Sequence, residues 1–139
     1  MTELQQKIVD AARACLGTPF RHQGRIPSKA LDCAGLAVVS LRAAGVEVRD
    51  MSAYSSTPHD DKLMAIVSLQ RGLRFVGVDS MQPGDVLILK IGNEPSHIGI
   101  YTGNKQIIHA YEQAGKVVEH RMDGAWHTKI VACYRAEAK

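Results

Sequence analysis

The chain lacks the paired cysteine spacing that marks disulfide scaffolds and structural zinc sites. Its 139 residues contain three cysteines, Cys15, Cys33 and Cys133, and none of them belongs to a CxxC pair. An odd set of separated cysteines argues against a disulfide framework and is typical of a reducing compartment. At least one thiol must therefore be free.

The sequence also has no apolar run near the roughly 18 residues that a membrane-spanning helix needs. It begins MTELQQKIVDAARA, an amphipathic pattern without the basic and then apolar segments that mark an export signal. We therefore expect no membrane insertion and synthesis in the cytoplasm. Action elsewhere would need a separate delivery route.

Neither sign of charge dominates the composition. Lys and Arg number 17 against 14 Asp and Glu, and the basic residues are dispersed, so we expect no nucleic-acid partner. Apolar residues make up 45% and charged residues 22%, the usual mixture of a soluble globular protein. Without repeats or linkers, residues 1–139 are expected to form a single domain.

Helical patterns occupy the first part of the chain. The first covers about residues 3–16, and the Gly- and Pro-containing segment 17–31 is predicted to be a loop of the kind that lines a site. Asp32 precedes an apolar run that stops at Gly45, so it should be the N-cap of a buried helix. Cys33 then falls in the first turn of that helix.

A third helix is predicted to open at Thr57 and Pro58. Its apolar face would consist of Leu63, Ile66, Val67 and Leu69. Six short apolar runs follow, at 73–78, 85–91, 97–103, 105–111, 116–122 and 129–135. Helices followed by strands predict an α+β fold, with N-terminal helices packed on a roughly six-stranded antiparallel sheet.

Cys33 is the candidate nucleophile. A thiol attacks carbonyl carbons as the thiolate, which a helix N-terminus or an adjacent imidazole stabilises. We therefore expect its reactivity pKa below the roughly 8.5 of a free cysteine. The alternative is a buried, inert cysteine, as expected for Cys15 and Cys133.

Two histidines on neighbouring predicted strands could serve that thiol. If Tyr101 pairs with Lys105 across a three-residue loop, His97 lies opposite His109 on one face of the sheet. A two-residue turn at Gly103 and Asn104 would put them on opposite faces. On one face, His97 would accept the thiol proton and His109 would fix its tautomer.

Other interpretations of these residues remain open. A single strand histidine more often satisfies a core hydrogen bond, and Cys33, His22, His97 and His109 could also form a zinc site, although CxxC and HExxH spacings are absent. The other histidines lie in polar or alternating segments and are expected to be exposed and without a role. They are His59, His120 and His127.

Five segments resemble, in order, the motifs of the NlpC/p60 family of cell-wall cysteine peptidases. They are GTPF (17–20), DCAGL (32–36), PGDVLIL (83–89), SHIGIYTG (96–103) and IIHA (107–110). The resemblance implies a papain-like fold with Cys33 as nucleophile, His97 as base and His109 as the orienting residue, without metal or cofactor. It also implies hydrolysis of the D-glutamyl-diamino acid bond in the peptidoglycan stem peptide.

Within that family, LGTPFRHQGR followed by DCAGL is similar to compact members encoded with phage tail modules. This implies phage tail proteins as partners, with a virion tail or secretion machine delivering the protein to the periplasm or cell wall. The longer interval between Cys33 and His97 places surplus residues at 51–72, which could cap the cleft or bind a tail protein. A catalytically inactive assembly protein and a secreted antibacterial amidase toxin are the alternatives.

The sequence departs from the family pattern at two positions near the cysteine. Phe20 replaces a tyrosine and Ala34 replaces a serine, which removes one hydroxyl near the nucleophile and a contact to the free amine of the substrate. His22 could substitute for the first. The residues that could bind substrate or stabilise an oxyanion are therefore His22, Phe20, Asp32, Ala34 and Ser96, with the backbone N–H of Cys33.

Overall fold

The computed structural model describes residues 1–50, 62–91 and 94–137, without the side chains of residues 62–63 and 94–96. In this part of the chain the α-helices are α1 (Glu3–Arg13), α2 (Cys33–Ala43), α3 (Lys62–Ser68) and α4 (Gly124–His127). Short 3₁₀ turns span Val78–Ser80 and Glu112–Ala114. None of these helices combines the length and apolar composition that a bilayer crossing requires.

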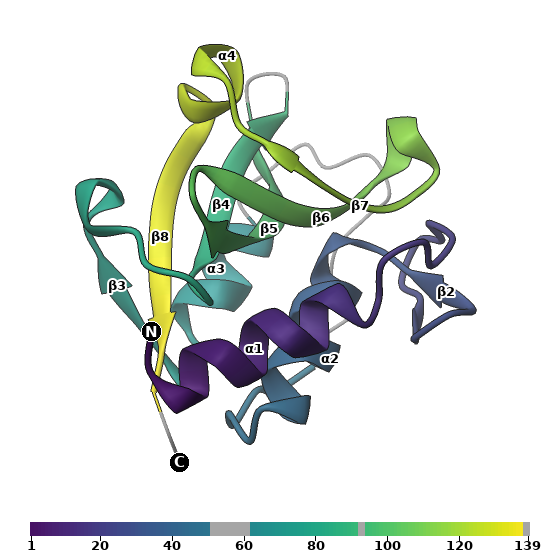
Figure 1. The fold of residues 1–139 in the computed structure, drawn as a ribbon, viewed down its shortest axis with the longest axis horizontal. Coiled ribbons are helices and arrows are strands. Elements are labelled where there is room, and N and C mark those ends of the chain that lie inside the picture. The colour runs from purple at the N-terminus through teal and green to yellow at the C-terminus, as the bar shows by residue number, and fades with distance from the viewer. Residues whose placement is uncertain (51–61, 92–93, 138–139) are drawn as a thin grey trace.

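Six strands form one sheet in the order β3-β8-β4-β5-β6-β7, and all its pairings are antiparallel. They are β3 (Leu73–Val76), β4 (Val86–Ile91), β5 (Glu94–Gly103), β6 (Gln106–Tyr111), β7 (Lys116–Arg121) and β8 (Ile130–Ala136). Helices α1 and α2 lie side by side against this sheet (Figure 1). The predicted α+β fold with a six-stranded antiparallel sheet is confirmed.

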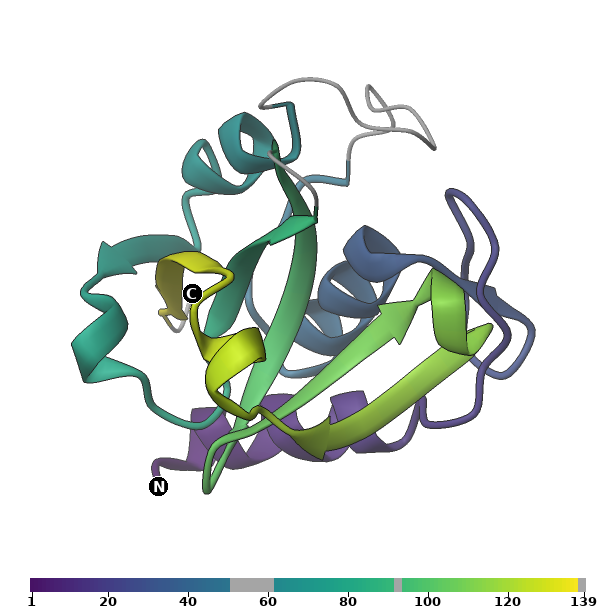
Figure 2. The ribbon, with the colours of Figure 1, turned by 90° about the horizontal axis from the view of Figure 1, so that it is seen from above.

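Both faces of the sheet are covered by apolar side chains. Ile98 of β5 belongs to the main core, which α1 and α2 share. On the other face, Leu87 and Ile107 form a second cluster, against which Trp126 of α4 packs. Figure 2 shows α4 on the side of the sheet away from α2. The two covers explain why residues 86–89 form a continuous buried run instead of an alternating one.

The caps of α2 agree with the sequence. The Asp32 carboxylate accepts a hydrogen bond from the backbone N–H of Gly35 at 2.7 Å, so it is the N-cap. Gly45, with φ of 85°, follows the end of the helix in the left-handed conformation that favours glycine. Helix α1 ends at Arg13, three residues before the predicted end. Turns, instead of helix, span residues 14–17.

The third predicted helix is partly corrected. Val67 of α3 is buried and Ile66 packs against the core, as expected. Leu69 is 76% exposed, so its place on the apolar face was wrong; the helix ends at Ser68 and its periodicity does not continue. The predicted start at Thr57 and Pro58 and the side chain of Leu63 lie outside the described residues.

The segment 17–31 is more ordered than a simple loop. It contains a small antiparallel pair, β1 (Arg25–Ile26) and β2 (Ala30–Leu31), and Phe20 forms a parallel bridge with Leu31. Strands of two residues are too short to show a period in sequence, which is why they were not predicted. The pairing brings this segment directly to the start of α2.

Candidate active site

Cys33 is the first residue of α2, and its side chain is 9% exposed. The backbone groups of Ile98 and Ala34 lie near its sulfur and lower the pKa of the thiol, against the larger effect of burial. Ile98 directly follows His97 on β5, so the sulfur lies against the part of the strand that carries this histidine. The start of a helix favours negative charge on sulfur, but burial of Cys33 opposes it.

Asp32 anchors the segment 17–31 to the start of α2. Its Oδ1 atom accepts hydrogen bonds from the Gly35 N–H at 2.7 Å and from Nη1 of Arg25 at 2.9 Å, and its Oδ2 atom accepts one from the Gln23 N–H at 2.7 Å. Arg25 also pairs with Asp50 at 2.9 Å. Asp32 therefore fixes the position of Cys33. Its hydrogen bonds show this structural role, whereas the sequence also suggested that Asp32 could bind substrate.

The turn between β5 and β6 differs from the prediction. Tyr101 pairs with Ile107, and the expected pairing with Lys105 is wrong. The turn consists of Asn104 and Lys105, whose φ angles are 51° and 62°. Two left-handed residues are the requirement of a type I′ turn, and a lysine in this conformation gave no signal in the sequence. A register shift between Tyr101 and Gly103 then lengthens β5 by one residue.

This shift restores the shared face that a two-residue turn alone would have abolished. Continuing the observed register puts His109 opposite Gly99, so His97 is its diagonal neighbour on the same face. The Nε2 atom of His97 lies 2.7 Å from the Nδ1 atom of His109. The predicted contact between the two imidazoles is therefore present, reached through a different register.

His120 extends this contact, and it is half-buried instead of exposed as expected. Its side chain is half-buried, and its Nε2 atom lies 2.8 Å from Nε2 of His109. Its Nδ1 atom lies 3.0 Å from the backbone oxygen of Arg121. His109 pairs with Val118 across β6 and β7, so His120 is again a diagonal neighbour. The spacing of His109 and His120 across the β6–β7 hairpin could have predicted this contact from the sequence.

Aromatic rings enclose the three histidines. Tyr111 stacks on His109 with centroids 4.9 Å apart and an interplanar angle of 13°. Trp126 of α4 lies edge-on to His109 at 5.2 Å and contacts His120 at 5.0 Å. Neither aromatic residue was singled out from the sequence. Together they cover His109, which is fully buried.

Burial sets the protonation of these groups. It raises the pKa of the Cys33 thiol to about 12, with the Asp32 charge acting in the same direction. Burial also lowers the pKa of His97 to about 4. The pKa of His109 is lowered to about 3, first by burial and then by the neighbouring His97 and His120. The expected depressed thiol pKa is therefore reversed: the resting pair is a neutral thiol and a neutral imidazole.

The remaining candidate residues have different surroundings. Phe20 is half-buried against the main core, and its N–H donates to the Gly115 carbonyl at 2.9 Å. His22 is exposed, Ala34 is buried, and the side chain of Ser96 lies outside the described residues. Within the described residues, no group of three or more His, Cys, Asp and Glu side chains has the arrangement of a metal site.

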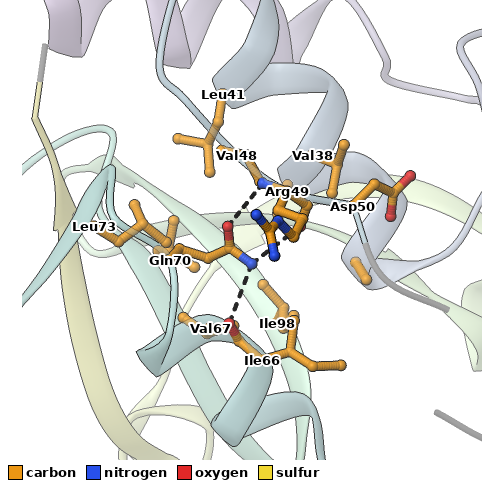
Figure 3. A pocket seen from close by; sticks show the side chains of 13 residues that line it. Val38, Leu41, Val48, Arg49, Asp50, Ile66, Val67, Gln70, Leu73 and Ile98 are labelled. Atoms are coloured by element: carbon orange, nitrogen blue, oxygen red, sulfur yellow. Dashed lines mark hydrogen bonds between the residues drawn. The ribbon is translucent and has the colours of Figure 1, made fainter. Parts of the chain in front are cut away.

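An apolar cavity of about 40 Å³ begins next to the candidate nucleophile. Ala34, which follows Cys33, and Ile98, which follows His97, both line it. Figure 3 shows Val38 and Leu41 of α2 together with Ile66 and Val67 of α3 around this space. A serine at position 34 would have added a hydroxyl to this apolar lining.

Gln70 is the buried polar group of the cavity wall. Its Oε1 atom accepts from the N–H of Arg49 at 2.8 Å, and its Nε2 atom donates to the carbonyls of Arg49 at 3.0 Å and Ile66 at 3.2 Å (Figure 3). These bonds satisfy the amide and join the segment after α2 to α3. The cavity wall is therefore held by hydrogen bonds that leave its surface apolar.

Comparison with known proteins agrees with the fold. Residues 17–135 match the family described as NlpC/P60. A relative named probable endopeptidase NlpC, from Escherichia coli K12, is 30% identical over 122 residues, covering 86% of this chain and 70% of the relative. The murein DD-endopeptidase MepS/murein LD-carboxypeptidase of the same organism is 24% identical over 125 residues, covering 89% of this chain and 58% of that protein.

Solved structures share the architecture. The peptidoglycan hydrolase RipB from Mycobacterium tuberculosis superimposes with a TM-score of 0.66 at 20% identity, over 97% of this chain and 66% of that one. The NlpC/p60 domain of the peptidoglycan hydrolase SagA gives the same TM-score at 23% identity, over 94% of this chain and 97% of that one. The fold is therefore the papain-like fold of these structures.

Proposed function

Because the chain belongs to the NlpC/P60 family, we propose that it is a cysteine peptidase that hydrolyses an amide bond in the stem peptide of peptidoglycan. The observation that carries this proposal is the 2.7 Å hydrogen bond between His97 and His109, next to Ile98, whose backbone lies near the sulfur of Cys33. The pairing of the two imidazoles on β5 and β6, together with the position of Cys33 at the start of α2 near Ile98, supports Cys33 as nucleophile, His97 as base and His109 as orienting group.

The proposed reaction proceeds through an acyl-enzyme. The Cys33 sulfur attacks the amide carbonyl carbon while its proton passes to His97, and the backbone N–H of Cys33 donates to the developing oxyanion. His97 then protonates the leaving amine as the C–N bond breaks. A water molecule, deprotonated by His97, hydrolyses the thioester and restores the thiol. Burial disfavours both the thiolate and the imidazolium, which favours proton transfer and attack in one step over a preformed thiolate.

The bond between D-glutamate and a diamino acid is the proposed site of cleavage, on the basis of the resemblance of the motifs. Two residues modify this proposal. Ala34 offers no hydroxyl to the free amine of the substrate and lines an apolar cavity, and Phe20 offers none near the nucleophile. We therefore expect the substrate's free amine to contribute less to binding here than a serine at position 34 would allow.

The test is digestion of purified peptidoglycan. Soluble muropeptides from several wall types are incubated with the protein and with its Cys33→Ala variant, and the products are identified by mass spectrometry. New termini at one amide bond, absent with the variant, support the proposal. Unchanged muropeptides from every wall type with folded wild-type protein would contradict it.

Delivery by a phage tail or secretion machine, with tail proteins as partners, is proposed from the sequence resemblance alone. The absence of both expected hydroxyls, at Phe20 and Ala34, also favours a second candidate, an assembly protein that keeps the fold without activity. Infection with a phage that carries Cys33→Ala separates the two. Lost wall penetration supports the enzyme, and full infectivity supports the assembly protein. An antibacterial toxin would instead kill a neighbouring cell that lacks a cognate immunity protein.

A further inference from the structure

Three histidines, His97, His109 and His120, are joined in a row by hydrogen bonds between their rings. We propose that His120 is a positioning residue that fixes the tautomers of His109 and His97, leaving Nδ1 of His97 unprotonated and able to accept the thiol proton. The tautomer assignment concerns the resting protein, and its catalytic consequence rests on the proposed function.

The assignment begins at the backbone oxygen of Arg121. A carbonyl oxygen can only accept, so the Nδ1 atom of His120, 3.0 Å away, carries a proton. In a neutral imidazole the other nitrogen is then an acceptor, and Nε2 of His120 accepts from Nε2 of His109 at 2.8 Å. One fixed acceptor at the end of β7 therefore decides which nitrogen of His109 is protonated.

The tautomer of His109 in turn determines the direction of its hydrogen bond with His97. Because His109 is protonated at Nε2, its Nδ1 atom accepts a hydrogen bond from Nε2 of His97 at 2.7 Å. Nδ1 of His97 is then left with a lone pair. The opposite polarity would put a proton on that nitrogen, which could no longer act as a base. The carbonyl oxygen of Arg121 therefore determines, through successive hydrogen bonds, the tautomer of all three histidines.

Burial and aromatic neighbours stabilise these tautomers. Burial lowers the pKa of His97 to about 4 and that of His109 to about 3, so both rings are neutral near pH 7, as the alternation of donor and acceptor requires. Tyr111 stacks on His109 and Trp126 contacts both His109 and His120, and His109 itself is fully buried, so its ring nitrogens do not face bulk water. Among the described residues, His120 is the acceptor that dictates the tautomer of His109.

Nitrogen NMR of protein labelled in its histidine rings tests the tautomers directly. Wild-type protein at pH 7.5 should show His97 and His109 protonated at Nε2 and His120 protonated at Nδ1, with assignments from single-histidine variants. The variant His120→Phe, which fills the space without an acceptor, should lose the pure Nε2–H state of His109 or His97. A proton on Nδ1 of His97 in the wild type, or unchanged tautomers in His120→Phe, would overturn the inference.

Activity on muropeptides provides the second readout. His120→Phe should lower kcat roughly 10-fold or more with little change in KM, whereas His120→Gln, whose amide oxygen can accept from His109, should recover most of the loss. The matched control is His127→Phe, at an exposed position of α4, and should leave kcat unchanged. If the tautomers are as assigned but no muropeptide is cut, the proposed function fails and the assignment stands. If cleavage occurs and His120→Gln is as impaired as His120→Phe, the positioning role fails.

Discussion

Nε2 of His97 and Nδ1 of His109 are hydrogen-bonded at 2.7 Å even though their strands place them two residues out of register. Diagonal neighbours in an antiparallel pair are within reach of ring side chains. Gly99, the residue opposite His109, has no side chain, and a Cβ there would overlap the side chain of Ile107. The missing side chain leaves room for the two strands to approach at this point.

Removing the acceptor of this bond should reduce turnover. In His109→Phe, nothing accepts from Nε2 of His97, so its tautomer and orientation are no longer fixed, and kcat should fall by about 10²-fold or more. KM should change little. Steady-state kinetics on a purified muropeptide measure this effect, with circular dichroism to verify the fold. A fall of less than threefold would mean that His109 only fills space.

Alkylation of Cys33 should report a protonated thiol at neutral pH. Burial raises its pKa to about 12, so the thiolate fraction, and with it the rate of reaction with iodoacetamide, should keep rising through pH 9. An inflection near pH 4, which a thiolate-imidazolium pair would produce, should be absent.

The charge of Asp32 provides a second check on the same reaction. It raises the pKa of the neighbouring thiol, so Asp32→Asn, which can still cap α2, should react faster than wild type at each pH. Asp50→Asn, which also removes a partner of Arg25, is the control and should have a smaller effect. Equal acceleration by both variants would indicate loosening of the segment instead of an electrostatic effect.

Acid should destabilise the protein through its buried histidines. The pKa values of His97 and His109 are lowered in the fold, to about 4 and about 3, from about 6.5 when unfolded. Their neutral forms therefore stabilise the fold fully above pH 6.5, and this contribution is lost as the pH falls towards 4 and 3. The loss is up to about 1.4 kcal/mol per histidine for each pH unit.

Urea unfolding at pH 7.5, 5.5 and 4.5 measures this dependence. The double variant His97→Phe/His109→Phe lacks both titrations, so its free energy of unfolding should fall less steeply over the same range. Parallel curves for the two proteins would show that other groups, such as the carboxylates, cause the acid instability.

Gly35 should tolerate no side chain. A Cβ at this position would overlap the carbonyl oxygen of Gly24, which cannot move without displacing the backbone that Asp32 and Arg25 hold. Gly35→Ala should therefore lower the free energy of unfolding by about 1–3 kcal/mol. Gly124→Ala, where a Cβ meets no neighbouring atom, is the matched control and should change it by less than about 0.5 kcal/mol.

Much of the candidate site could be predicted because its signals are local. Asp32 before an apolar run identified a capped helix, which fixed Cys33 in the first turn without knowledge of any partner. His97 and His109 were placed on neighbouring strands by periods of two. The precise register was not predicted, because a lysine in the left-handed conformation and a bulged residue leave no mark in composition or alternation.

The sequence by itself determined which residues begin α2, which segments become strands, and that two histidines of neighbouring strands would lie near one another. These features depend on neighbours a few residues apart. Only the tertiary structure brought His120 to His109 and reversed the expected protonation of Cys33. Both depend on which side chains meet across strands and on how completely they are buried, and those quantities arise from contacts between residues distant in the chain.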